Sequence, residues 1–410
     1  MLAHTASMKM GRKVSGNVNN KKILMLSWEY PPNVVGGLSR HVEGLAKALT
    51  IIGYQIHIIT TWVEELPMYE RIGNIEIFRV VPLNEGDPSF IRWVGGLNLS
   101  IVHQAMDLMK EHEYALIHAH DWLVGAAAVT LKEKRQLPLV TTIHATEHGR
   151  NEGIYTEMQK KIYEQEKELI HHSDKIIICS SSMKEEVLHI FKIEPEKIVM
   201  IPNGIDTSIA NITYKKEILE KFPIHQKKKM VFSIGRMVNE KGFHTLIEAA
   251  KEMERSRSDV YFIIAGKGPM LQEFRHRVEV LGLNNIHFIG FVTDDEREAL
   301  FKQCYLAVFP SLYEPFGIVA LEAMAYSKPT IVSNVGGLKS IISHLHTGLL
   351  MSSNNAKSFI EQAMMLLDNE ELAIQLGESG KRMVDTMYSW NKIAEDTHRV
   401  FEETVMQIRL

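Results

Sequence analysis

Short apolar runs alternate with helix-like segments along almost the whole chain, and this alternation strongly constrains the fold. The first two runs, Ile23–Ser27 and Ile56–Thr60, flank a segment, Leu38–Leu49, with apolar residues at helical spacing. Continuous apolar runs of this length are typical of parallel strands that are buried on both faces. The alternation therefore predicts parallel sheets covered by helices, an α/β fold.

The alternation occurs in two series. Further strands of the first series are predicted at 75–80, 115–118, 139–143, 175–179 and 197–201, and those of the second at 230–234, 260–265, 286–289, 306–309 and 329–332. Helices are predicted at 97–111, 122–135, 156–172, 182–191, 242–254, 269–281, 294–303, 317–326 and 356–368. A polar linker between the series predicts two doubly wound, Rossmann-like domains, 21–205 and 206–388, that face a central cleft.

Composition excludes several classes of protein. With 46 Lys and Arg against 50 Asp and Glu, the net charge of −4 argues against a nucleic-acid-binding protein. Two cysteines, Cys179 and Cys304, lie beside apolar runs, and the sequence has neither a disulfide framework nor a zinc motif. Residues 1–20 lack the apolar core of a signal peptide and are predicted to be a disordered tail. We expect a cytoplasmic protein, with at most peripheral membrane contact through the segment that begins at Phe90.

Polar residues follow three strands of the first series. Gly36 and Gly37 lie between the first strand and its helix, where glycine allows close backbone approach and helix N–H groups can hold a phosphate. His120 and Asp121 follow one strand, and His144 and His148 follow the next. In loops at strand ends, histidines and acids are candidates for polar contacts or proton transfer. The alternative for the glycines is a plain tight turn.

In the second series, cations follow the first strand. Arg236 and Lys241 share one loop, and such a pair suits a diphosphate, although two solvated surface cations are the alternative. Gly266 begins a tight turn that matches only half of the dinucleotide-binding fingerprint.

The stretch from Pro310 to Ala325 is the most informative. Glu314 lies in a loop, Gly317 opens a helix with free N–H groups, and Glu322 lies on that otherwise apolar helix. A carboxylate on such a helix requires hydrogen-bond partners, which sugar or ribose hydroxyls would supply. The alternative is a structural carboxylate with partners inside the protein.

The sequence offers little for a metal ion. It contains no Asp-x-Asp and no Cys/His cluster. His144 and His148 are four residues apart, but they follow a strand and have no evident third ligand. We therefore expect neither a dedicated metal site nor a cofactor.

Taken together, these motifs resemble the retaining, nucleotide-sugar-dependent glycosyltransferases of family 4, which have the GT-B fold. The resemblance runs from Lys21 to about Phe401 and is most specific in Glu314–Ala325. In this fold the last helix crosses back onto the first domain, which implies that 389–410 is that helix.

The resemblance implies roles for particular residues. Arg236 and Lys241 would neutralise the departing diphosphate, and Glu314 would hold the transferred sugar. His144 would lie at the reactive side of that sugar. The remaining donor-binding positions would be Gly36, Gly37, Gly266, Phe316, Gly317, Ile318 and Glu322.

The donor and acceptor are also implied by resemblance. The segments around His120 and His144 are similar to glycogen-synthase-like members. This similarity implies a UDP- or ADP-sugar donor, with glucose as the expected sugar, and a glycan or glucoside acceptor. His120, Asp121 and His148 would lie on the acceptor side. Ala145 and Val34 stand where many members have Asp and Lys. The alternatives are a non-catalytic structural or binding protein of a cell-envelope or coat layer, a sugar-nucleotide epimerase, and a dehydrogenase.

Overall fold

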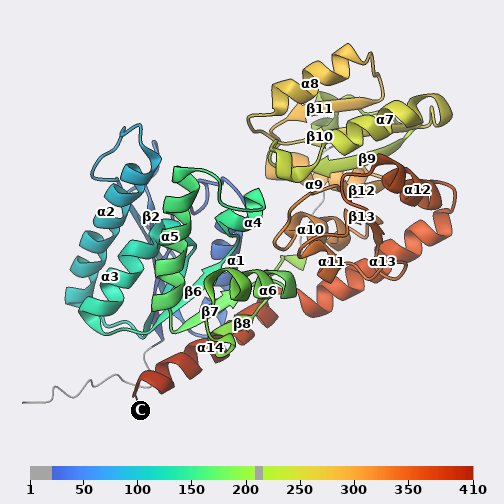
Figure 1. Ribbon diagram of the computed structural model, residues 1–410. Helices are drawn as coiled ribbons and strands as arrows, with labels where there is room; N and C mark the ends of the chain where they lie inside the picture. The colour runs from blue at the N-terminus through green and yellow to red at the C-terminus, as the bar shows by residue number, and fades with distance from the viewer. Residues whose placement is uncertain (1–20, 208–215, 410) are drawn as a thin grey trace, which may run out of the picture.

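Two parallel sheets, each with helices on both faces, form the protein in the computed structural model, which describes residues 21–207 and 216–409 (Figure 1). The predicted tail, 1–20, lies outside these residues. The first sheet has the strand order β3-β4-β2-β1-β5-β6-β7-β8, and the second β11-β10-β9-β12-β13-β14. Every pair is parallel except β3 with β4.

The elements of the first sheet and its helices are β1 (Lys22–Leu26), α1 (Gly37–Ile51), β2 (Gln55–Thr61), β3 (Tyr69–Ile72), β4 (Ile75–Val80), α2 (Phe90–Glu111), β5 (Leu116–His120), η1 (Trp122–Val124), α3 (Gly125–Arg135), β6 (Leu139–Ile143), α4 (Glu147–Asn151), α5 (Glu157–His172), β7 (Lys175–Ile178), α6 (Ser181–Phe191), η2 (Pro195–Lys197) and β8 (Ile198–Met200).

The elements of the second sheet are η4 (Lys216–Lys221), β9 (Lys229–Ile234), η5 (Asn239–Lys241), α7 (His244–Ser256), β10 (Val260–Ala265), α8 (Leu271–Val280), β11 (Ile286–Gly290), α9 (Asp294–Gln303), β12 (Leu306–Phe309), α10 (Ile318–Ala325), β13 (Thr330–Ser333), α11 (Leu338–Ile341), β14 (Leu349–Met351), α12 (Ala356–Leu367) and α13 (Glu370–Met387), followed by α14 (Trp390–Arg409). No helix of the described ranges has the length and apolar character needed to cross a bilayer.

Burial explains why the apolar runs become strands. In β1, Ile23 and Met25 pack with α1 and α14 on one face, whereas Leu24 and Leu26 pack with helices on the other face. The central strands of the second sheet are covered in the same way, so each run is apolar throughout rather than alternating. The predicted α/β architecture is confirmed.

Several elements differ from the sequence prediction. Strand β3 was not predicted, and three of its four residues are exposed because it forms the antiparallel edge of the sheet. The helix predicted over 97–111 begins at Phe90. Strand β14 and helices α11 and α13 were also not predicted.

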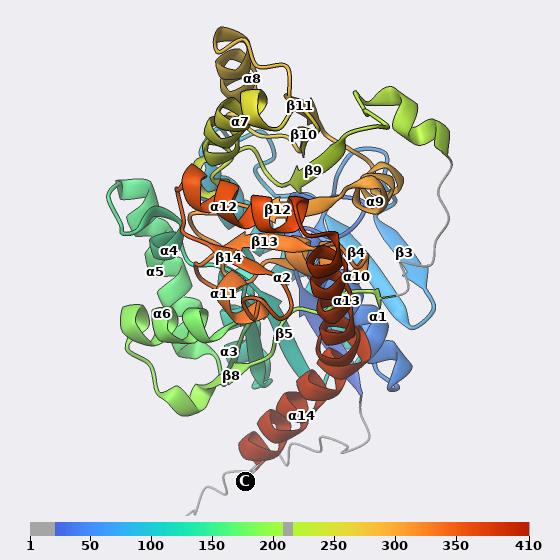
Figure 2. The ribbon, with the colours of Figure 1, turned by 90° about the vertical axis from the view of Figure 1, so that its right-hand side faces the viewer.

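The chain returns to the first sheet through α14, which runs beneath that sheet in Figure 1 and projects below both sheets in Figure 2. Ile393, Ala394, Val400 and Phe401 of this helix join the apolar cluster of β1 and α1. Where the chain leaves the first sheet and where it returns, the two segments pair: Ile205 N–H donates to the Tyr388 carbonyl at 2.8 Å, and Ile205 and Ser389 form a bridge.

The indole of Trp390 fits against two glycines, one in α1. A Cβ atom at Gly44 would lie 2.1 Å from the Trp390 ring, and one at Gly204 would lie 2.5 Å from it. Only glycine leaves this space, so α14 packs directly against the backbone of the first domain.

We expect Gly44→Ala to destabilise the protein, although alanine normally favours a helix by about 1 kcal/mol over glycine. The overpacking against Trp390 should cost about 1–3 kcal/mol. Urea unfolding measures the effect. Gly95→Ala in α2 is the matched control, because its Cβ would meet nothing within 4 Å and should stabilise the helix. A Gly44→Ala midpoint equal to or above the wild-type midpoint would contradict this packing.

Candidate active site

The strand order determines where a ligand can bind. In the first sheet the chain moves outward from β1 to β2 and then returns to β5 on the other side of β1, and in the second sheet the same reversal separates β9 from β12. At such switch points the loops after the two strands diverge and leave a crevice beyond their carboxyl ends. Most of the site residues predicted from the sequence lie in these loops or in the helices that follow them.

Lys241 and Glu314 form the central ion pair of the second switch point. Lys241 Nζ lies 2.5 Å from Glu314 Oε2, and the Ser311 hydroxyl lies 3.5 Å from the same oxygen. Glu314 is buried, whereas the Lys241 side chain is about one fifth exposed. The loops after β9 and β12 are therefore joined by a charge-assisted hydrogen bond that also holds a cation at the crevice.

Two glycines fit the backbone of these loops closely. Gly242 has φ +65°, and a Cβ there would lie 2.1 Å from the Pro310 carbonyl oxygen. Gly266 has φ +139°, and its Cβ would lie 1.8 Å from the Gly235 carbonyl oxygen. Gly266 therefore packs beneath the start of the cation-bearing loop, as its place after β10 suggests.

Arg236 lies on the same loop as Lys241 but is exposed. Its Nη2 atom is 2.7 Å from Glu240 Oε1, and the Glu240 carbonyl accepts a hydrogen bond from Leu312 N–H at 2.8 Å. The two predicted cations thus belong to one loop, and each has a carboxylate neighbour.

Helix α10 begins beside this ion pair. Gly317 is its N-cap with φ +111°, and Ile318 is its first residue, while Phe316 is buried immediately before it. The Glu314 carbonyl accepts a hydrogen bond from Gly337 N–H at 2.8 Å. The first N–H groups of α10 are therefore held at the cleft, where a helix terminus favours an anion.

Glu322 is buried in α10, and it has a protein partner. Arg297 Nη1 of α9 lies 3.7 Å from Glu322 Oε1 and 3.2 Å from Asp294 Oδ1. Asp294 in turn contacts Arg40 of α1 at 2.6 Å. A row of alternating charges thus connects Glu322 with the first helix of the other sheet.

Glu29 is a site residue that motif analysis missed. Its buried carboxylate accepts hydrogen bonds from Val35 N–H at 2.6 Å, Gly36 N–H at 3.3 Å and Ser39 N–H at 3.2 Å. The N–H of Ser39, in the first turn of α1, is therefore occupied, as are those of the two residues Val35 and Gly36 before the helix. Gly37 nevertheless lies close to the second domain, because a Cβ there would lie 3.2 Å from Ile318 Cδ1.

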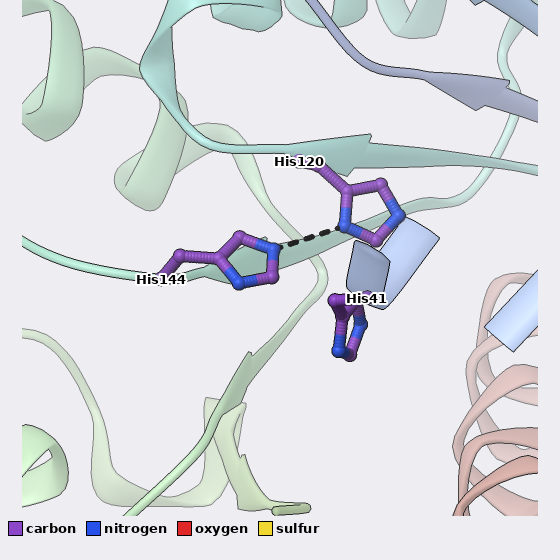
Figure 3. Close-up of side chains that lie close together, drawn as sticks. All are labelled: His41, His120 and His144. Atoms are coloured by element: carbon purple, nitrogen blue, oxygen red, sulfur yellow. Dashed lines mark hydrogen bonds between the residues drawn. The ribbon is translucent and has the colours of Figure 1, made fainter. Parts of the chain in front are cut away.

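The histidines lie where the first sheet ends. His120 is the last residue of β5 rather than a loop residue, and His148 lies in α4 rather than in a loop. His120 Nδ1 is 3.2 Å from His144 Nε2 (Figure 3). Asp121 Oδ1 accepts the His144 backbone N–H at 2.7 Å, and burial raises the Asp121 pKa to about 6. Asp121 therefore fixes the backbone that carries His144.

Loops from both sheets touch across the cleft. The Ser180 hydroxyl donates to the Pro315 carbonyl at 2.7 Å, and the Tyr313 hydroxyl donates to Glu186 at 3.2 Å. The loop that carries Glu314 is thus anchored to the first sheet on one side of the cleft, and Arg40 meets Asp294 elsewhere along it.

The fold and its cleft define the class of proteins with two α/β domains. Comparison with known proteins identifies the family within that class. The family model described as Glycosyltransferase Family 4 matches residues 35–209, and the one described as Glycosyl transferases group 1 matches residues 214–383. An uncharacterized glycosyltransferase of Methanocaldococcus jannaschii is 34% identical over 386 residues, covering 93% of this chain and 98% of that protein.

A second relative and a solved structure are also similar to this chain over most of its length. A glycogen synthase of Mycobacterium tuberculosis is 30% identical over 400 residues, covering 93% of this chain and 94% of that protein. Sucrose-phosphate synthase from Thermosynechococcus elongatus has a similar structure, with a TM-score of 0.83 at 21% identity, covering 94% of this chain and all of the other. The chain belongs to the group 1 glycosyltransferases and has the GT-B fold, as the motifs indicated.

Glu29 makes stability depend on pH. Burial raises the pKa of its carboxyl from 4.5 to about 7, although the three backbone hydrogen bonds oppose the rise. As pH increases, the unfolded chain releases this proton first, so the folded state loses stability between about pH 4.5 and 7. The difference in pKa corresponds to about 3 kcal/mol.

The Glu29→Gln variant keeps an uncharged side chain at this position and should lack that loss. We expect wild-type stability relative to Glu29→Gln to fall as the pH is raised from 4.5 to 7.5. Urea unfolding of both proteins across this range measures the difference. Other buried carboxyls that titrate there, such as Asp121, are present in both proteins, so their contribution cancels in the comparison. A pH-independent difference would contradict the raised pKa.

Proposed function

We propose that the protein is a retaining glycosyltransferase that moves a hexose from a nucleoside-diphosphate sugar to a hydroxyl of a glycan or glucoside. The proposed hexose is glucose. The observation that carries the proposal is the ion pair of Lys241 with Glu314 beside Arg236 and the start of α10. Two cations and a helix terminus in one crevice suit the diphosphate of a leaving nucleotide.

In the proposed reaction, the bond between the sugar C1 and the diphosphate oxygen breaks, and the acceptor oxygen bonds to C1 on the same face. Negative charge develops on the departing diphosphate, where Lys241 and Arg236 would neutralise it. The acceptor hydroxyl proton passes to that leaving oxygen. The electrostatic part of this step needs no metal ion, because the protein supplies the positive charge.

The other predicted residues would bind the donor. Glu322 would accept hydrogen bonds from ribose hydroxyls, Glu314 would hold the sugar, and His144 would lie at its reactive side. UDP or ADP is the proposed nucleotide. We further propose a cytoplasmic location, since both cysteines are buried free thiols.

Substitution of either cation tests the leaving-group role. We expect Lys241→Ala and Arg236→Ala to lower kcat by about 10²–10³-fold, the size typical for loss of one preorganised charge-stabilising group. Steady-state kinetics measures the effect, and circular dichroism checks the fold. Lys251→Ala, an exposed lysine on α7 of the same sheet, is the matched control and should keep full activity. Normal turnover in both cation variants would refute the role.

A thermal-shift screen identifies the donor. The purified chain is heated with UDP, ADP, GDP and their glucose, N-acetylglucosamine and mannose conjugates, without divalent metal. One nucleotide should raise the melting temperature, because a ligand at about 100 times its Kd stabilises the folded state by about 2.7 kcal/mol. If no nucleotide stabilises the folded chain, a non-catalytic binding role is favoured. Conversion of a donor sugar without acceptor would instead favour an epimerase.

A further inference from the structure

Three histidines from separate parts of the sequence meet at the end of the first sheet. His41 lies in α1, His120 ends β5, and His144 follows β6. Figure 3 shows the three imidazoles gathered together, and one nitrogen from each lies within 4.8 Å of the others. Sequence spacing gives no sign of this cluster, because the distances along the chain are too long for a ligand motif.

One of these imidazoles is buried without a hydrogen bond to it. Within the part of the chain that the structure describes, neither ring nitrogen of His41 has a hydrogen-bond partner. An unpartnered buried polar atom costs free energy, and its presence calls for an explanation. Burial also lowers the pKa of all three imidazoles, so they are neutral near pH 7 and keep the lone pair that a metal requires.

The spacing suits a tetrahedral metal ion. With Zn–N bonds of 2.0–2.1 Å, two ligand nitrogens of a tetrahedral site lie about 3.3 Å apart. His120 Nδ1 and His144 Nε2 already lie 3.2 Å apart. The ring centroid of His41 is 4.8 Å from that of His144, and its ligand nitrogen lies within 4.8 Å of the other two, so metal binding requires the His41 ring to move toward them.

Neighbouring residues hold the three histidines in place. Asp121 holds the His144 backbone, and the ring of His118 packs 4.2 Å from that of His120. The buried Oδ1 atom of Asn203 lies beside His41, with the two side chains near hydrogen-bonding distance. Such an oxygen can accept the N–H of an imidazole whose other nitrogen binds a metal, which fixes the ring.

We propose that His41, His120 and His144 form a binding site for one divalent transition-metal ion, with Zn²⁺ as the ion of choice. Imidazole ligands select Zn²⁺, Cu²⁺ and Ni²⁺ over Mg²⁺ and Ca²⁺. Three protein ligands leave a fourth position open, and His144 is the one ligand of the three that is partly exposed.

The bound ion inhibits sugar transfer. This consequence rests on the proposed function, in which His144 lies at the reactive side of the donor sugar. A metal ion would hold the His144 ring and occupy the space in front of it. The site is thus inhibitory rather than part of the reaction.

Cobalt spectroscopy tests the site without reference to activity. The full chain is treated with a chelator and titrated with Co²⁺, whose visible absorption is intense in a tetrahedral site. We expect one equivalent to give the tetrahedral spectrum and one equivalent of Zn²⁺ to abolish it. Absence of the tetrahedral band, or a weak octahedral spectrum, would overturn the proposal.

Variants identify the ligands. His41→Gln should weaken Co²⁺ binding more than about 10-fold. His148→Gln, which removes the histidine four residues from His144, is the matched control and should bind as the wild type does. If His41→Gln does not fold, as judged by circular dichroism, His120→Asn takes its place. Wild-type affinity in a folded ligand variant would refute the assignment.

Inhibition is measured separately. Stoichiometric Zn²⁺ should abolish most of the transfer by the wild type, and a chelator should restore it. Cobalt binding without any effect of Zn²⁺ on turnover would refute the inhibitory role but not the site. If the chain proves to have no transferase activity, the cobalt spectrum still decides whether the site exists, so failure of the proposed function is distinguishable.

Discussion

Burial of parallel strands on both faces is the constraint on which the rest of the structure depends. Strands such as β1 and β9 have almost no solvent-exposed face, so their side chains are available only for packing. Chemistry is thus confined to strand ends, loops and helix starts, and parallel direction brings these ends to one edge of each sheet. Lys241, Glu314 and His144 lie at such edges for this reason. The cleft therefore results from the strand direction and from the reversal of strand order.

The sequence predicted the fold well because that constraint is visible in it. A run such as Val260–Ala265 is apolar at every position, and the structure has a strand with those bounds. The edge strand β3 could not be predicted in this way, because Tyr69 and Ile72 are half exposed and pair only with β4. Its existence depends on a partner that local propensity does not report.

The site was predictable only in part. Glycines and charged residues in strand-end loops pointed to Gly317 and Lys241, and the resemblance to a family gave them roles. The partners were not predictable: that Lys241 contacts Glu314, that Glu29 caps the loop of Gly36, or that His41 meets His144. Each is a contact between elements far apart in sequence, and only the tertiary fold determines it. The position of His120 was missed for a different reason. It lies inside β5 because that strand extends beyond its apolar run.

The pairing of Ile205 with Ser389 has a consequence for topology. The chain leaves the first sheet and re-enters it at neighbouring points that are hydrogen-bonded to each other. In connectivity the second sheet is an insertion into the first domain, with its two ends fastened together. Two adjacent, hydrogen-bonded crossings resist relative twisting of the two domains more than a single crossing would, so the connection itself helps to keep the loops of the two sheets in register.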